Sequence, residues 1–277
     1  MTPKEAPVGR LVVCPTPIGN LEDVTLRVLD TLRGADLIAC EDTRHTKRLL
    51  DRHGIEGRLI SFHEHNEPAR SGELVARMRA GERVALVSDA GMPLVSDPGY
   101  LLLQGAFAAG VAVEVLPGPS AALVALVASG LPSGRWCFVG FLPRRTGELE
   151  TLFRGACDTL VAFESPRRLG RTLEVLAGVD PERPACVCRE LTKVHEEVVR
   201  GSARELAKRY GERPAKGEVV IVCGAAPPGA QTREDAVAAL RELLTAGARP
   251  RPAASAVARL TGLSANDLYR DSSTRGQ

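Results

Sequence analysis

The chain has 277 residues, of which 44% are hydrophobic and 25% charged, and 36 basic and 34 acidic side chains give a formal net charge of +2. This composition excludes a chain that is disordered throughout, and the length favours two domains of about 100 to 200 residues each. No apolar run approaches the roughly 20 residues of a membrane-spanning helix, and residues 1–7 lack the pattern of a signal peptide. We therefore expect a cytoplasmic protein without a membrane partner.

The first part of the chain alternates apolar runs with amphipathic stretches of helix length. Strands are expected at residues 10–14, 36–40, 58–61, 83–88 and 112–116. Helices are expected between them at residues 24–33, 43–53, 68–80 and 99–109. This alternation is typical of a parallel sheet wrapped by helices, so we predict an α/β domain over residues 8–117.

A Pro-Gly-Pro turn at residues 117–119 marks the expected domain boundary. After a small-residue helix at 120–129, strands are expected at 136–141, 159–163, 185–188, 196–200 and 219–223, with helices at 167–177 and 203–210. This pattern is less regular than the first one, which favours a second α/β domain with a mixed sheet over residues 118–224.

A segment rich in Pro, Gly and Ala, residues 225–231, reads as a linker to a C-terminal part. Helices are expected there at residues 233–244, 252–260 and 264–269. Gly262 would end one helix and Ser264 would cap the next, so residues 232–277 resemble a small helix-turn-helix module. Its seven basic and five acidic side chains are compatible with a substrate-docking element, and packing between two copies is the alternative.

The cysteines and histidines do not predict a metal site. Five cysteines lie in or beside apolar, strand-like runs and are expected to be buried thiols: Cys14, Cys40, Cys137, Cys157 and Cys223. Cys186 and Cys188 would share one face of a strand, because side chains alternate with a period of two. The chain has no CxxC and no HExxH motif, so we expect no bound metal.

Three loops that follow expected strands carry unusual residues. They span residues 15–20, 88–99 and 116–120. In open α/β sheets, ligands bind beyond the carboxyl ends of the strands, where these loops lie. Gly19 would let a ligand approach the backbone, and Ser120 could cap the helix that follows it. The absence of GxGxxG and GxxxxGK[ST] motifs disfavours the usual dinucleotide and nucleoside-triphosphate sites.

Six segments in one order carry a family resemblance. They are residues 13–20, 40–44, 88–99, 117–121, 163–168 and 189–193. Together they resemble the ribosomal RNA 2′-O-methyltransferases of the tetrapyrrole methylase superfamily. The resemblance implies a two-domain methylase, usually a homodimer, that binds S-adenosyl-L-methionine (SAM) in the cleft between its domains. It also implies methylation of a cytidine ribose in the decoding centre of small-subunit (16S) ribosomal RNA, either as free RNA or in the assembled 30S subunit.

The resemblance further implies which residues bind the cofactor. Ile18 and Gly19 fall on a glycine-proline-glycine turn of the superfamily, with Ile18 in place of the proline. Ser88 and Asp89 fall on a glycine-aspartate-proline signature, from which Ala90 departs. Met92 stands where threonine is commoner. The remaining matches are Ser120, Ala121, Glu164 and Leu191. Loops rich in Gly, Ala and Pro with one or two acids suit the apolar, polar and cationic parts of SAM.

Methyl transfer to a ribose requires that a very weakly acidic hydroxyl lose its proton, so a base or a stabilising cation should lie within hydrogen-bond reach. We predict that Glu190 and Lys193 serve this step and that Arg44 orients the ribose-phosphate. A desolvated lysine can act as either group. The alternative is that Glu190 and Lys193 form a structural ion pair.

RNA contact should be directed mainly at phosphates, because aromatic residues make up only 4% of the chain. The candidate side chains are Arg44, His45, Lys47, Arg48, Arg144, Arg145, Arg167 and Arg168. Two other functions stay open. One is methylation of a tetrapyrrole precursor, as elsewhere in the superfamily, and the other is a non-catalytic RNA-binding or ribosome assembly factor.

Overall fold

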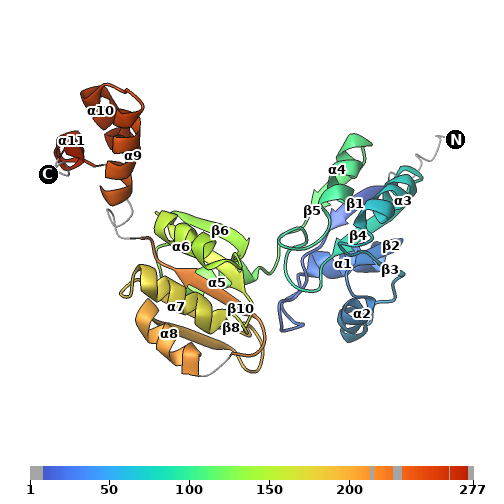
Figure 1. Ribbon diagram of the computed structural model, residues 1–277. Coiled ribbons are helices and arrows are strands. Elements are labelled where there is room, and N and C mark those ends of the chain that lie inside the picture. The colour runs from blue at the N-terminus through green and yellow to red at the C-terminus, as the bar shows by residue number, and fades with distance from the viewer. Residues whose placement is uncertain (1–8, 213–214, 227–232, 262, 274–277) are drawn as a thin grey trace.

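The structure is a computed structural model that describes residues 9–212, 215–226, 233–261 and 263–273. Its first sheet is entirely parallel (Figure 1). Its strand order is β3-β2-β4-β1-β5. The strands are β1 (Arg10–Val13), β2 (Leu37–Cys40), β3 (Leu59–Ser61), β4 (Arg83–Val87) and β5 (Ala112–Val115). The helices that connect them are α1 (Leu26–Gly34), α2 (Thr43–Arg52), α3 (Glu67–Arg79) and α4 (Tyr100–Ala108). The predicted parallel α/β arrangement is confirmed.

Alternating side chains of these strands enter two separate cores. Val12 and Ile38 pack with α1 and α2 on one face of the sheet, whereas their neighbours Leu11 and Leu37 pack with α3 and α4 on the other. Two helix starts are fixed locally, because Thr25 Oγ1 accepts a hydrogen bond from Val28 N and Asp42 Oδ1 accepts one from Arg44 N. The loops between each strand and the helix that follows it therefore lie at the carboxyl edge of the sheet.

The second sheet is mixed, as predicted. Its order is β6-β7-β10-β8-β9, with β6 parallel to β7 and the other pairs antiparallel. The strands are β6 (Trp136–Phe141), β7 (Thr159–Glu164), β8 (Pro184–Arg189), β9 (Glu197–Ser202) and β10 (Val219–Cys223). The helices are α5 (Ala121–Ser129), α6 (Thr146–Gly155), α7 (Leu169–Val179) and α8 (Ala203–Glu212). The sequence analysis did not identify α6.

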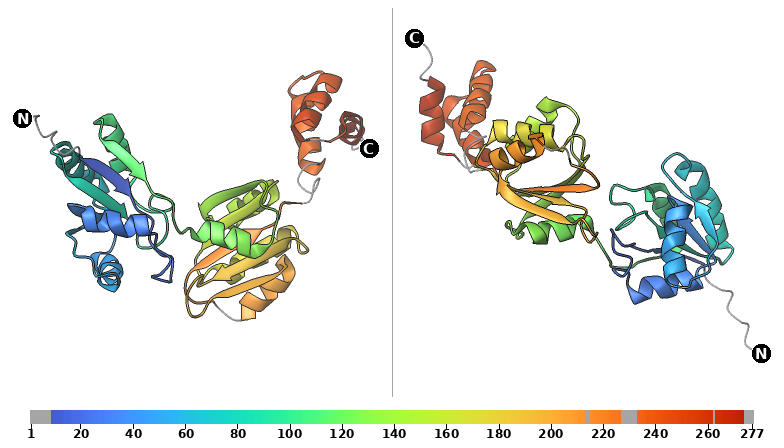
Figure 2. Two further views of the ribbon diagram at one scale, coloured as in Figure 1. Left: turned by 180° about the vertical axis from the view of Figure 1, so that it is seen from behind. Right: turned by 90° about the horizontal axis from the view of Figure 1, so that it is seen from below.

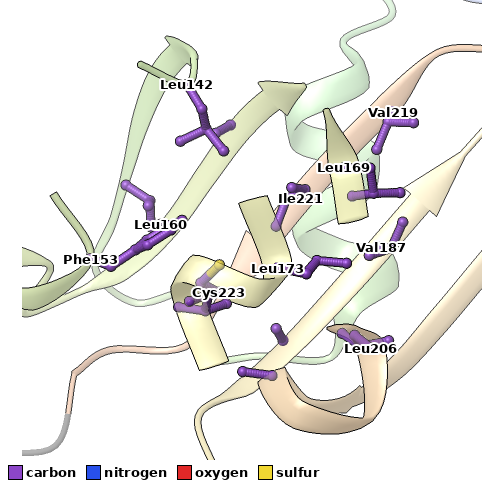
Figure 3. Close-up of a cluster of buried hydrophobic side chains, with 14 of the residues drawn as sticks. Leu142, Phe153, Leu160, Leu169, Leu173, Val187, Leu206, Val219, Ile221 and Cys223 are labelled. Carbon is purple, nitrogen blue, oxygen red and sulfur yellow. The ribbon is translucent and has the colours of Figure 1, made fainter. Parts of the chain in front are cut away.

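Helices cover both faces of this second sheet. Helix α5 packs on one face, and α6, α7 and α8 pack on the other. Figure 3 shows the core under the latter three, where Phe153 of α6 and Leu173 of α7 meet Leu160 and Ile221 of the sheet. Helix α5 follows β5 directly in the chain, so one short connection that contains Pro117 joins the two sheets.

Three further helices form a separate C-terminal bundle. They are α9 (Arg233–Thr245), α10 (Pro250–Thr261) and α11 (Ala265–Ser273), and they surround a small core of their own centred on Leu240, Val257 and Leu268. Figure 1 and the left view of Figure 2 show this bundle apart from the two sheets. Some predicted features lie outside the described residues. They are the linker residues 227–231, the helix end at Gly262, residue 8 at the start of the first domain, and residues 232 and 274–277 at the bounds of the C-terminal module.

The cysteines follow the packing of the sheets only in part. Cys14, Cys40 and Cys223 are buried, and Cys186 Sγ lies 3.7 Å from Cys188 Sγ on one face of β8. Cys137 and Cys157 are exposed, so their predicted burial was wrong. The reason is position, because Cys137 lies on the edge strand β6 and Cys157 lies in the connection between α6 and β7. None of the described helices is both long and apolar enough to cross a membrane.

Candidate functional site

A cavity of about 410 Å³ lies between the two sheets. The first domain contributes Ile18 and residues 90–92 and 95–97, which follow β1 and β4. The start of α5 adds Ser120 and Ala121. The second domain contributes Phe141, residues 163–166, Cys188, Leu191 and residues 217–220. The first domain thus lines the cavity with loops at the carboxyl edge of its parallel sheet, where ligands bind in this class of fold.

One wall of the cavity is apolar and joins the two domains. Ile18 lies in the loop after β1 of the first domain and is buried in a cluster with Ala122 of α5 and Leu191 of the second domain. Val220 and Cys188 of the second sheet belong to the same cluster. An apolar wall with this composition can hold a flat, weakly polar group such as a purine base.

Asp97, in the loop after β4, also lines the cavity. The pKa of this carboxyl is raised from 3.8 to about 6, mainly by burial and also by the charges of Glu41 and Asp89, against a hydrogen bond from Ser88. Burial also raises the pKa of Glu41, and the negative charges of Asp89 and Asp42 act in the same direction. The resulting negative field favours a cation near Asp97, because a cation would stabilise the ionised carboxylate. Asp97 lies in the loop of residues 88–99 but was not among the residues predicted to bind the cofactor.

Glu164 also lines the cavity, and its carboxylate is fully engaged. Oε2 accepts a hydrogen bond from Thr172 Oγ1 at 2.5 Å and forms an ion pair with Arg168 at 3.2 Å, and Oε1 accepts one from Ser165 N at 2.7 Å. Arg168 also donates to Leu142 O and Pro143 O. Arg168, predicted to contact RNA, is therefore half-buried and occupied in holding Glu164 and the end of β6.

The loop after β4 is fixed by the loop after β1. Thr16 and Gly91 exchange backbone hydrogen bonds of 2.9 and 3.0 Å, and Thr16 Oγ1 donates to Ser88 O at 2.9 Å. Gly91 (φ 82°) adopts a left-handed conformation, and so do two residues that are not glycine, Leu94 (φ 71°) and Ser96 (φ 70°). This path turns residues 95–97 into the cavity.

Three residues predicted to bind the cofactor do not line the cavity. Ser88 is buried and its hydroxyl donates to Gly91 O at 3.3 Å. Asp89 Oδ1 accepts a hydrogen bond from Asp42 N at 3.0 Å and so positions the start of α2. Gly19 lies against the second domain instead. Ile18, Met92, Ser120, Ala121, Glu164 and Leu191 do line the cavity.

Gly19 allows the two domains to approach closely beside the cavity. A Cβ atom at this position would lie 2.5 Å from Lys193 Cγ and 2.7 Å from Thr192 Oγ1. The neighbouring Asn20 N donates to Thr192 Oγ1 at 3.0 Å. The loop after β1 is thus fastened to residues 191–193.

Ser120 occupies the position before α5, but its side chain makes no capping hydrogen bond. Its predicted capping role is therefore not realised, and its hydroxyl lies in the lining of the cavity. The mainly apolar sequence of α5 is instead held by burial of Ala125 and Leu126 against the second sheet.

Lys193 forms two ion pairs at the rim. Its Nζ lies 2.9 Å from Glu190 Oε1 and 2.9 Å from Glu218 Oε2. Burial acts to lower the pKa of Lys193, but the hydrogen bonds to Glu218 and Glu190 outweigh it and raise this pKa. Lys193 is therefore a cation and not a neutral base. Glu218 lines the cavity, whereas Lys193 and its other partner, Glu190, do not.

The remaining basic candidates lie on the surface. Arg44 is 87% exposed and pairs with Asp42 at 2.7 Å, and Lys47 pairs with Asp51 at 3.1 Å. His45, Arg48, Arg144, Arg145 and Arg167 are also exposed. Arg167 directly follows residues 165–166 of the cavity wall, so its place at the rim is fixed by the chain. None of these side chains lines the cavity.

Comparison with known proteins agrees with the geometry. A family model described as Tetrapyrrole (Corrin/Porphyrin) Methylases matches residues 10–207. The chain belongs to the tetrapyrrole methylase family. A similar protein of Mesorhizobium japonicum, named ribosomal RNA small subunit methyltransferase I, is 47% identical over 94% of this chain and 90% of its own length. A protein of the same name from Escherichia coli O157:H7 is 42% identical over 95% of this chain and 94% of its own length.

Solved structures of tetrapyrrole methylases share the two-sheet fold. The structure of uroporphyrin-III C-methyltransferase from Thermus thermophilus has a TM-score of 0.58 and 25% identity, and covers 77% of this chain and 94% of that chain. A structure of this enzyme in complex with S-adenosylhomocysteine has a TM-score of 0.56 and 23% identity. Family membership makes the chain a SAM-dependent methyltransferase, which confirms the predicted cofactor.

The residues of the cavity fit this cofactor. SAM combines an adenine, a ribose, an amino-acid tail and a sulfonium cation. The apolar wall of Ile18, Leu191 and Val220 suits the adenine, and the carboxylate of Asp97 suits a cationic part. The volume of about 410 Å³ lies within the range of small-molecule sites.

Proposed function

We propose that this methylase transfers the methyl group of SAM to the 2′-hydroxyl of a cytidine ribose in the decoding centre of small-subunit ribosomal RNA. The observation that carries the proposal is the cavity walled by both domains, whose lining combines an apolar cluster with the carboxylate of Asp97 and is followed directly in the chain by the exposed Arg167. The names of the relatives support ribosomal RNA as the substrate, free or in the 30S subunit. Such a substrate places the protein in the cytoplasm.

Within this proposal, the cofactor supplies an electrophilic methyl group, and the protein supplies its orientation. Ile18 and Leu191 would hold the adenine, and Asp97 would face the positive charge. Ser120, Ala121 and Met92 lie in the same lining and would bound the remaining part of the cofactor. Fixing the acceptor oxygen in line with the methyl carbon would provide much of the acceleration, because alignment on binding lowers the entropic part of the activation free energy.

The acceptor side of the proposal rests on the rim. The cation Lys193, held by Glu190 and Glu218, would stabilise negative charge on the ribose oxygen as the hydroxyl proton passes to water, and Arg44 would orient the ribose-phosphate. The exposed residues His45, Lys47, Arg48, Arg144, Arg145 and Arg167 would bind neighbouring phosphates. The ion pairs of Arg44 with Asp42 and of Lys47 with Asp51 are exposed, so a phosphate can compete for these cations.

Exposed apolar side chains support a homodimer. Phe107 of α4 and Val115 of β5 are each 57% exposed, and Val127 of α5 and Phe141 of β6 are 78% and 62% exposed. Strands β5 and β6 are edge strands of their sheets. Large apolar side chains on unpaired edges are typical of surfaces covered by a partner. We therefore propose that a second copy covers them, and light scattering should give twice the chain mass of 29.5 kDa.

A competition experiment tests the proposed reaction. Purified protein with labelled SAM is offered small-subunit ribosomal RNA, 30S subunits and a uroporphyrin-type tetrapyrrole. The proposal predicts label in the ribose of one RNA cytidine and none in the tetrapyrrole. Label in the tetrapyrrole alone would establish the alternative suggested by the solved structures, and SAM binding without transfer would favour a non-catalytic RNA-binding factor.

A further inference from the structure

The exposed arginines of helix α10 and of the residue before it form a basic face on the C-terminal bundle. Arg249, Arg251 and Arg259 are exposed, and no acidic residue occurs between Ala248 and Thr261. Arg251, Ser255 and Arg259 follow one another at intervals of four, so they form one row on the helix. Eight residues at 1.5 Å each separate the ends of this row by about 12 Å.

These three arginines differ from Arg241 and Arg270, which also belong to the bundle. Arg270 pairs with Asp267 at 2.7 Å, and Arg241 donates to Asp271 O at 2.9 Å, which ties α9 to α11. For Arg249, Arg251 and Arg259, by contrast, the described part of the chain supplies no ion pair and no side-chain hydrogen bond. Their positive charge is therefore not neutralised within the bundle.

The bundle is also separable from the methylase. Its helices pack against one another around their own core. Two relatives named ribosomal RNA small subunit methyltransferase I, from Hydrogenobaculum and Thermotoga maritima, match over 217 residues, which are 94% and 98% of their own length. In this chain the two α/β domains occupy residues 9–226, so these relatives have room for both domains but not for the bundle as well. An element absent from the shorter relatives is accessory to the chemistry.

We propose that the basic face of α10 binds the phosphate backbone of the ribosomal RNA substrate, away from the nucleotide that is methylated. This inference rests on the proposed function for its choice of partner. Guanidinium groups bind phosphate oxygens with two parallel hydrogen bonds, and the row of Arg251 and Arg259 is long enough to reach more than one phosphate. Arginines on a helix without acidic residues attract a polyanion, because the helix itself adds no repelling carboxylate.

The test compares the full-length protein with the double variant Arg251→Gln/Arg259→Gln. The matched control, Arg79→Gln/Arg154→Gln, removes two exposed charges from α3 and α6. Binding to a transcript of small-subunit ribosomal RNA is measured by fluorescence anisotropy from 50 to 300 mM salt. For two lost contacts, we expect affinity to fall about tenfold, and the slope of log K against log salt to decrease by about 1.4 for single-stranded RNA.

Methylation assays separate this docking role from catalysis. The variant should show a raised KM for the RNA, an unchanged kcat and an unchanged affinity for SAM. The proposal would be overturned if the variant and the control had the same RNA affinity and the same salt slope. It would also be overturned if the variant differed only in its mass in light scattering, which would assign the face to contact with a second copy. Because anisotropy needs no turnover, failure of the proposed reaction would leave this measurement valid.

Discussion

Asp97 is a cavity carboxylate whose raised pKa brings its change of charge close to neutral pH. Since its pKa is raised to about 6, it is largely protonated at pH 5 and ionised above pH 7. We expect the affinity for cationic SAM to increase between pH 5 and pH 7 and then to level off. In Asp97→Asn this increase should be lost, and affinity at pH 7.5 should fall roughly tenfold or more. Calorimetric titration at each pH measures both effects, and equal pH profiles for variant and wild type would contradict this role.

The same pKa shift predicts the stability of the variant. A carboxyl whose folded pKa exceeds its unfolded value of 3.8 contributes stability below that value, and this contribution is lost as pH rises through 6. Asp97→Asn should therefore be at least as resistant to urea as the wild type at pH 7.5. Weakened SAM binding in a protein of undiminished stability would show that the loss is local.

Lys193 provides a second prediction at this scale. Its ion pairs keep it protonated, so an arginine at this position should preserve the positive charge and most of the activity. Lys193→Ala should lower the single-turnover rate of methylation by roughly tenfold or more, as for loss of one charge-stabilising group. No rate increase attributable to lysine deprotonation should appear up to pH 9. Normal single-turnover rates in both Lys193→Ala and Glu190→Gln would leave these residues with a structural role only.

At the scale of elements, the loop after β1 is expected to control how closely the domains meet. Gly19→Ala places a methyl group 2.5 Å from Lys193 Cγ, so the loop and residues 191–193 must move apart. Because Ile18 of the apolar wall precedes this position, we expect SAM affinity to fall about tenfold, in the range of overpacking costs. Calorimetry of SAM binding measures the effect.

The matched control is Gly72→Ala on α3, where an added Cβ meets nothing within 4 Å. It should leave SAM affinity unchanged and stabilise the protein by about 0.5–1 kcal/mol through helix propensity. If both alanine variants bind SAM as the wild type does, the close approach at Gly19 has no bearing on the site.

Most elements could be predicted from the sequence, because apolar periodicity and helix-ending residues mark them. The parallel first sheet and the mixed second sheet follow from this pattern. Helix α6 was missed, although its buried residues Leu149 and Phe153 are four apart, as in an amphipathic helix. The exposure of Cys137 could not be predicted, since it depends on β6 lying at a sheet edge.

The site was predictable at the level of loops but not of individual side chains. The rule that ligands bind beyond the carboxyl ends of parallel strands identified the loops after β1 and β4. Which aspartate of the second loop lines the cavity depends on the left-handed turns at Leu94 and Ser96, and neither residue type predicts that conformation. The family resemblance instead pointed to Asp89, which anchors the start of α2.

At the scale of the whole molecule, the C-terminal bundle is expected to be dispensable for folding and cofactor binding. A chain that ends at Ala226 retains both sheets and the hydrogen bond from Ala226 N to Ala156 O. It should bind SAM with unchanged affinity but methylate ribosomal RNA poorly. Calorimetry and a methylation assay measure these outcomes. Loss of SAM binding in a truncated protein that still unfolds cooperatively would show that the bundle supports the cavity directly.

The central claim is that this methylase modifies the ribose of one cytidine in small-subunit ribosomal RNA. The most direct test maps 2′-O-methylation on that RNA from cells that lack the protein, that regain it, and that carry Asp97→Asn. The account predicts one cytidine that loses its ribose methyl group without the protein, regains it with the wild type and stays largely unmethylated with the variant. An identical methylation map in all three strains would contradict it.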